Sequence, residues 1–276
     1  MVDEHTKIIG RLHTIASPRG LNVYNPFFNE AKINALYLLF FNPDPKPLVE
    51  GLKQLNLTGA ITAGFESDSR LPLLLDELDD VTKYVGKVGF IKNSNGILKG
   101  YTQSGDGMLK TIEKTGNIAN KKIVIVGAGN VTKALLYKIS KYSHQPKEVE
   151  LYNRTIDKAE KLKSDFVFVK KVSLLDKLVE AEGDILVNLT KMGGSEPDTI
   201  FNEKLVGNFN SIVDVTFETE NTNLIQLAKK LNKNYATGWD MFTYQGLVIM
   251  ETLLETSIDA NLLKKHVAAG LSEVVK

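Results

Sequence analysis

One stretch of the chain, residues 122–130, has the residue types and spacing that hold a phosphate. A run of β-branched residues ends in Gly127-x-Gly129, and an apolar pattern with helical spacing follows from Val131 and Ala134. A buried strand that turns directly into a helix leaves backbone N–H groups free at the helix start, where they and the helix dipole bind a pyrophosphate. Gly127 permits the tight turn, and Gly129 lets the backbone approach the phosphates. We predict dinucleotide binding here; the alternative is an ordinary strand-to-helix turn.

The residues after the next strand-like run, 149–152, bear on which dinucleotide is bound. Proteins that bind NAD usually carry an acidic residue there, about 20 residues past the glycines. This chain instead has Asn153-Arg154-Thr155, with Lys158 one helical turn further on. The planar guanidinium of Arg154 suits a 2′-phosphate, which favours NADP over NAD. The alternative is that Arg154 and Lys158 are solvated residues at the start of a helix.

Alternating strand and helix patterns surround these residues and indicate an α/β fold with parallel strands. We predict strands at 7–10, 35–41, 59–62, 86–90, 96–101, 122–126, 149–153, 185–188, 212–215 and 235–238. We predict helices at 26–34, 45–56, 71–78 and 107–120, and from 241 to the end. The predicted domains are 1–106 plus 238–276, in which the C-terminal helices complete the first unit, and 107–237, which binds the dinucleotide.

The composition excludes several classes of function. At 276 residues, with 43% hydrophobic and 24% charged residues, the chain is typical of a soluble two-domain protein. A net charge of +1 favours neither nucleic acid nor an anionic membrane as partner. The absence of cysteine excludes thiolate catalysis, and four scattered histidines predict no metal site. No apolar run is long enough to span a membrane and no signal peptide is evident, so we expect a cytoplasmic protein.

The chain resembles the shikimate dehydrogenases and the related quinate/shikimate dehydrogenases over nearly its full length. The matching motifs, in family order, are Ser17-Pro18-x-x-x-Asn22, Gly96-x-x-x-Gly100-Tyr101, Gly127-Ala128-Gly129, Asn153-Arg154-Thr155-x-x-Lys158-Ala159, Asn188-x-Thr190, Asp214-x-x-Phe217-x-x-x-x-Thr222 and Gly238-x-x-Met241-x-x-x-Gln245. Each motif alone is weak, whereas the ordered set at these spacings is specific.

The resemblance implies an N-terminal α/β substrate domain completed by C-terminal helices, and a Rossmann domain that binds NADP. It implies hydride transfer between NADP(H) and a small polar ring compound, in a cleft between the domains, as part of aromatic amino acid biosynthesis. The implied cofactor-binding residues are Gly127, Gly129, Asn130, Val131, Asn153, Arg154, Thr155, Lys158, Thr190 and Met241. The implied substrate-binding residues that remain are Ser17, Thr62 and Gln245.

The catalytic positions of the family are substituted. Its Asn-Val-Thr-x-Pro-x-Lys segment corresponds here to residues 60–66, where the asparagine is Ala60, the proline Gly64 and the catalytic lysine Glu66. Its catalytic aspartate is Ser104, and Asp106 takes that role only if the loop shifts register. Glu66 is either a base or an acceptor for a polar ligand, or it pairs with Arg70. Ser104 fits a loop residue better than a nucleophile, because no base partner is evident.

Other substrate contacts change as well. The positions that differ from the family are Ile15 for a serine, Leu21 for a histidine, Gly89 for an asparagine and Phe217 for a tyrosine. Losing a positioned acid–base group costs roughly 10²- to 10⁴-fold in rate, so shikimate is expected to be a poor substrate.

Three hypotheses follow from these departures. The chain is an NADP-dependent oxidoreductase with a diverged substrate, or a catalytically silent homologue that binds NADP(H) or a metabolite, or a residual shikimate/quinate dehydrogenase. The sequence leaves the oligomeric state open.

Overall fold

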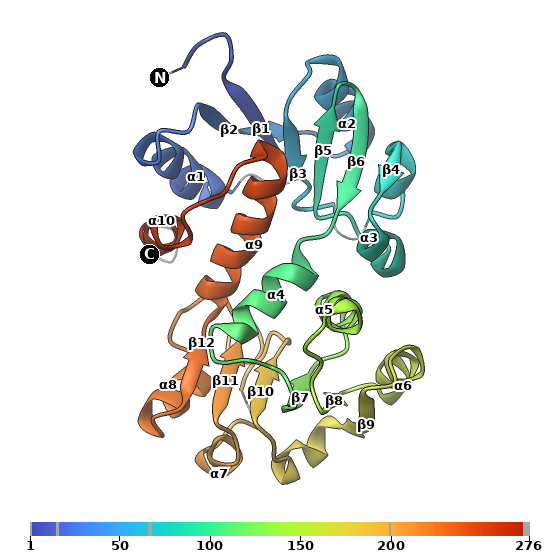
Figure 1. Ribbon diagram of the computed structural model, residues 1–276, viewed down its shortest axis with the longest axis vertical. Coiled ribbons are helices and arrows are strands. Elements are labelled where there is room, and N and C mark those ends of the chain that lie inside the picture. The colour runs from blue at the N-terminus through green and yellow to red at the C-terminus, as the bar shows by residue number, and fades with distance from the viewer. Residues whose placement is uncertain (1, 15–16, 66–67, 199, 273–276) are drawn as a thin grey trace. The chain divides into compact units, whose positions relative to one another are not determined.

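The computed structural model describes residues 2–14, 17–65, 68–198 and 200–272. The chain forms two compact units (Figure 1), a first unit of residues 1–103 with 245–276 and a second unit of residues 104–244. Each unit contains a six-stranded sheet with helices, which confirms the predicted two-domain α/β fold.

The sheet of the second unit is parallel throughout, and its strand order is β12-β11-β10-β7-β8-β9. The strands are β7 (Lys122–Val126), β8 (Glu148–Asn153), β9 (Val169–Leu174), β10 (Ile185–Asn188), β11 (Ser211–Asp214) and β12 (Asn234–Ala236). The chain order reverses between β7 and β10. In open parallel sheets, ligands bind at such a reversal, beyond the carboxyl ends of the strands.

Helices connect the strands of this sheet. They are α4 (Ser104–Glu113), α5 (Asn130–Lys141), α6 (Ile156–Asp165), α7 (Glu203–Gly207) and α8 (Asn223–Lys230), with a 3₁₀ helix at Leu175–Glu180. The central strands read as continuous apolar runs because helices leave them no exposed face; Val124 and Ile125 in β7 are fully buried.

The first unit has a mixed sheet in the order β2-β1-β3-β5-β6-β4. Its strands are β1 (Lys7–His13), β2 (Ala35–Phe41), β3 (Gly59–Ile61), β4 (Glu77–Leu78), β5 (Phe90–Ser94) and β6 (Ile97–Tyr101). β1, β2 and β3 are parallel, and β5 is antiparallel to both β3 and β6. Its helices are α1 (Arg19–Glu30), α2 (Pro45–Gln54), α3 (Asp80–Val85), α10 (Ala260–Ser272) and the part of α9 (Gly238–Leu254) that follows residue 244.

Two predicted elements were wrong and one strand was missed. The leucine-rich segment 71–78 forms a 3₁₀ helix at Leu71–Leu74 followed by β4, because Pro72 sits in the first turn and only Leu71 is buried deeply enough to anchor it. Gly86 ends helix α3 with a left-handed φ of 76°, so it does not begin a strand. Strand β9 was missed because only Val169 is buried and lysines interrupt its pattern.

Candidate functional site

The turn from β7 into α5 has the geometry of a phosphate-binding turn. Gly127 adopts a φ of +108°, and a Cβ there would lie 3.1 Å from the carbonyl oxygen of Leu189. Gly129 precedes α5 without any side-chain cap, and a Cβ there would meet nothing within 4 Å. The first N–H groups of α5 therefore remain available to an anion.

A pocket of about 380 Å³ opens at this turn, within the second unit. It is lined by the ends of β7, β8 and β10 and the loops that follow them, where the strand order reverses. The predicted cofactor residues that line it are Gly127, Gly129, Asn153, Arg154, Thr155, Lys158 and Thr190. Asn130 and Val131 are the first two residues of α5, and Met241 lies in the first turn of α9 and does not line the pocket.

The side chain of Arg154 is 75% exposed to solvent. It pairs with the carboxylate of Glu196 at 3.5 Å. Glu196 and Lys191 line the pocket too, and no motif in the sequence indicates either residue. The pair Gly193-Gly194 indicates a turn at this place. Nothing in the sequence shows that Glu196, two residues after Gly194, contacts Arg154.

A buried carboxylate holds the loops of this pocket in place. Asp214, 1% exposed, accepts hydrogen bonds from the Asn188 amide at 3.1 Å and the Thr222 hydroxyl at 2.6 Å. Asn188 in turn accepts from the backbone N–H and hydroxyl of Thr190 and donates to the carbonyl of Met192. Burial raises the pKa of Asp214, while these donors oppose that rise. The family motif residues Asn188, Asp214 and Thr222 thus position the pocket wall.

The retained substrate positions lie in the first unit. Thr62 is fully buried, and its hydroxyl donates to the carbonyl of Val88 at 2.6 Å. Ser17 is half-buried just before α1, and Gln245 is half-buried on α9. Whether these three residues contact a ligand stays a prediction.

Gln103 fills the space left by the missing side chain at Gly89. A Cβ on Gly89 would lie 2.0 Å from Oε1 of Gln103, so the two positions cannot both carry an inward side chain as they stand. Oε1 of Gln103 is buried and has no hydrogen-bond partner among the described residues. The sequence showed only the loss of the family asparagine, since an amide from a neighbouring segment cannot be located without the fold.

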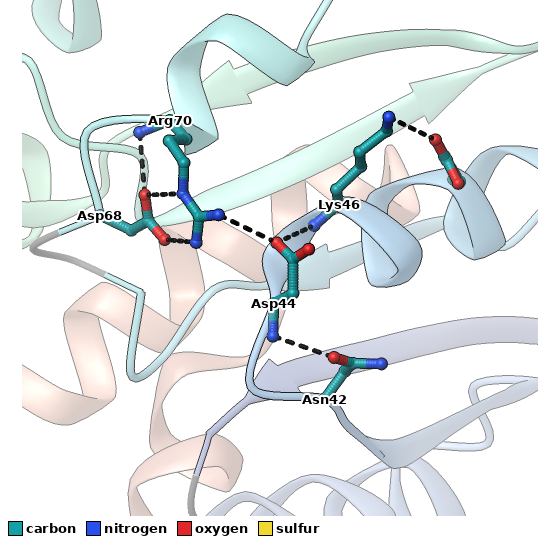
Figure 2. A network of polar contacts seen from close by, with 6 residues as sticks. Asn42, Asp44, Lys46, Asp68 and Arg70 are labelled. Atoms are coloured by element: carbon teal, nitrogen blue, oxygen red, sulfur yellow. Dashed lines mark hydrogen bonds and ion pairs between the residues drawn. The ribbon is translucent and has the colours of Figure 1, made fainter.

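Glu66 lies outside the described residues, so its pairing with Arg70 and its role as a base both stay predictions. Figure 2 shows the guanidinium of Arg70 between the carboxylates of Asp68 and Asp44. Its bonds to Asp68, at 2.7 and 3.0 Å, form a fork, and they lower the pKa of that carboxyl. These contacts fix the described end of the loop that follows β3.

The other two catalytic candidates, Ser104 and Asp106, lie in the first turn of α4. Asp106 pairs with Lys138 of α5 at 2.8 Å. A Cβ on Gly105 would lie 2.7 Å from the carbonyl oxygen of Ala134, so the two helices pack closely here. The ion pair gives Asp106 a structural role; its participation in proton transfer stays a prediction.

Across the described ranges, no grouping of three His, Asp or Glu side chains is arranged for a metal ion. No helix within those ranges is long and apolar enough to cross a membrane.

The strand order, the glycine turn and the pocket define an α/β protein whose second unit has the Rossmann architecture. A family model described as shikimate/quinate 5-dehydrogenase matches residues 110–211. The shikimate dehydrogenase (NADP(+)) of Pyrococcus furiosus is 28% identical over 276 residues, 99% of each chain. That of Aquifex aeolicus is 32% identical over 231 residues, 81% of each chain.

Solved structures agree with these relatives. A shikimate dehydrogenase in complex with NADP⁺ superposes with a TM-score of 0.82 at 25% identity, covering 97% of this chain and 96% of that one. The chain belongs to the shikimate/quinate dehydrogenase family, which confirms the resemblance inferred from its motifs.

Replacing Thr222 by valine is expected to lower the free energy of unfolding by about 2 kcal/mol, because Asp214 loses a donor and α8 loses its N-cap. The ionised carboxylate needs the donors most. Since the pKa of Asp214 is raised in the folded state, the deficit is largest at neutral pH and shrinks as pH falls toward about 3.9. Urea unfolding at several pH values measures this deficit. The control is Thr219→Val, a half-buried threonine whose hydroxyl makes no bond to Asp214 in the described part of the chain; equal deficits in both variants would refute the assignment.

Gly64→Pro restores the family residue yet is expected to destabilise the chain by about 3 kcal/mol. Gly64 adopts a φ of +96°, which a proline ring cannot reach. Gly51→Ala is the matched control, because Gly51 lies in helix α2 with open space around its Cβ position, and alanine there should stabilise by about 0.5–1 kcal/mol. Thermal unfolding of both variants measures the two stability changes, which are expected to have opposite signs. A Gly64→Pro variant with unchanged stability would contradict this loop conformation.

Proposed function

We propose that this protein is an NADP(H)-dependent oxidoreductase that interconverts a ring alcohol and its ketone, with a substrate other than shikimate. The observation that carries the cofactor half is the pocket, which combines an uncapped helix start with the Arg154 fork. The altered substrate is inferred from the substitutions at Ala60, Gly64 and Glu66. Family membership supports the reaction class.

The pocket residues fit a dinucleotide that carries a 2′-phosphate. The N–H groups at the start of α5 would hold the pyrophosphate, and Arg154 with Lys158 would hold the 2′-phosphate. The volume of about 380 Å³ is within the usual range for ligand pockets. When bound, the nicotinamide supplies or accepts the hydride.

Oxidation of an alcohol also requires a group that takes the hydroxyl proton. Glu66 stands at the position of the family lysine and is the residue we assign to this role. Asp106 is a weaker choice, because its carboxylate is already paired with Lys138.

A silent, ligand-binding homologue is the second candidate function. The Asp106–Lys138 ion pair favours it, because it engages the carboxylate that lies two residues from the position of the family aspartate. Such a protein would keep the cofactor pocket and the ligand contacts and lose proton transfer.

Arg154→Leu is expected to weaken NADPH binding by roughly 10- to 100-fold and NADH binding far less, because a charge-assisted bond to the 2′-phosphate is lost. Glu196→Gln is expected to strengthen NADPH binding by about 2- to 10-fold, because it removes a carboxylate that competes for Arg154 and repels the phosphate. Fluorescence titration of both cofactors gives the four affinities, with Arg70→Leu as the control. If Arg154→Leu lowers the affinities for NADPH and NADH equally, the assignment of Arg154 to the 2′-phosphate site is refuted.

Turnover is tested at high enzyme concentration with NADP⁺ and a panel of ring alcohols that includes shikimate and quinate, followed by NADPH absorbance. We expect turnover on at least one diverged alcohol, abolished by Glu66→Gln and retained by Asp106→Asn. No turnover across the panel, with NADPH binding intact, would favour the silent homologue. Rapid oxidation of shikimate itself would instead show a residual shikimate dehydrogenase.

A further inference from the structure

Arg11 on β1 differs from Arg70 and Arg154, because it has no carboxylate partner among the described residues. The sequence has four arginines, of which Arg70 and Arg154 pair with carboxylates. Arg11 is half-buried, hydrogen bonds to the hydroxyl of Tyr37, and forms no ion pair with any residue the structure describes. Its Nε atom is buried and has no hydrogen-bond acceptor among the described residues. A partly desolvated guanidinium with an unused N–H lacks an anion.

The surroundings of Arg11 place it beside the substrate segments of the first unit. The rings of Tyr24 and Tyr37 lie 5.0 Å apart. The Tyr37 hydroxyl lies 2.6 Å from the Cβ position of Gly20, in the first turn of α1. The Tyr24 hydroxyl lies 2.8 Å from the Cβ position of Gly246, the neighbour of Gln245. Arg11 therefore lies near the two segments that carry Ser17 and Gln245.

Among the residues that the structure describes, no carboxylate forms an ion pair with Arg11 at this corner of the unit, whereas Arg70 and Arg154 each have one. The first turn of α1 contains no acidic residue, and its backbone N–H groups add a positive partial charge. Burial raises the pKa of both Tyr24 and Tyr37 well above the usual range, so neither phenol ionises to neutralise the guanidinium. A ligand carboxylate would supply the missing charge and accept the Nε–H bond.

We propose that Arg11 anchors the carboxylate of the substrate. The anchor takes over from the family serine that is Ile15 in this chain. The inference deepens the proposed function and rests on it for the ring alcohol, whereas the anchor itself concerns binding alone. The divergence of the substrate then lies in its ring and hydroxyl groups.

Arginine modification tests the anchor without any turnover. The protein is treated with phenylglyoxal, and modification of each arginine is followed by peptide mass spectrometry. Shikimate or quinate is expected to protect Arg11 and leave Arg70 reactive, while NADP⁺ protects Arg154 alone. Methyl shikimate, which keeps the ring hydroxyls and lacks the charge, is expected to leave Arg11 reactive. Equal protection by acid and ester, or no protection of Arg11 by either acid, overturns the proposal.

Two variants measure the size of the effect. Arg11→Met is expected to weaken shikimate binding at least tenfold by calorimetry without cofactor, and to leave methyl shikimate binding unchanged. Arg11→Lys keeps the charge without the fork, so it should recover part of the preference for the acid, and it serves if the methionine variant fails to fold. A preference for acid over ester that is the same in wild type and both variants refutes the anchor.

The outcomes separate this inference from the proposed function. If the acids protect Arg11 but the protein turns over no ring alcohol, the proposed enzymatic function is refuted and the role of Arg11 as carboxylate anchor is retained. If the protein turns over an uncharged ring alcohol and neither acid protects Arg11, the proposed enzymatic function is retained and the role of Arg11 as carboxylate anchor is refuted.

Discussion

The buried carboxylate of Asp214 is the constraint on which the cofactor half depends. Its bonds to Asn188 and Thr222 join the segments after β10 and β11. Through Asn188 they also set the loop of Thr190 and Met192, which forms one wall of the pocket. A buried charge is tolerated only when several donors satisfy it, so these residues must change together or not at all. This requirement keeps the pocket intact whatever happens to the substrate chemistry.

The first unit shows the opposite condition at the residues near its substrate positions. Nε of Arg11 and Oε1 of Gln103 are both buried and lack partners among the described residues. Buried polar atoms in folded proteins are satisfied in the great majority of cases, and an exception needs a cause. The donor on Arg11 and the acceptor on Gln103 are groups that a ligand with a carboxylate and a hydroxyl would complete. This arrangement favours a protein that still binds a polar ligand.

Sequence alone predicted the elements whose pattern is set by burial. The runs at β7 and β10 are buried on both faces, so their apolar residues are continuous and easily recognised. The run at β2 is equally apolar, although this edge strand leaves Leu38 and Phe41 exposed. β9 has one buried residue, and 71–78 lies at a sheet edge, so neither has a distinctive period. Gly127 and Arg154 were identified because their roles are local to one strand end.

The missed residues depend on contacts between distant segments. Glu196 meets Arg154 across 42 positions of chain, and Gln103 occupies the space above Gly89 only because β5 and β6 are paired. Arg11 lies just beyond the strand predicted at 7–10 and belongs to no motif, because its lack of an ion pair among the described residues is a property of the packed unit. Motifs report the chemistry that a family shares, whereas compensating changes are visible only in three dimensions.

The two ligand-facing arginines differ in what binding costs. Arg154 is 75% exposed and already paired, and exchanging Glu196 for a phosphate gives up an exposed ion pair worth about 0–1 kcal/mol. A phosphate carries more charge than the carboxylate it displaces, so the exchange favours NADP at little cost. Arg11 forms no ion pair with a described residue and is already partly desolvated, so an incoming carboxylate would displace no such partner. The cofactor would therefore be selected because its phosphate replaces Glu196 at Arg154. The substrate would be selected because its carboxylate neutralises Arg11.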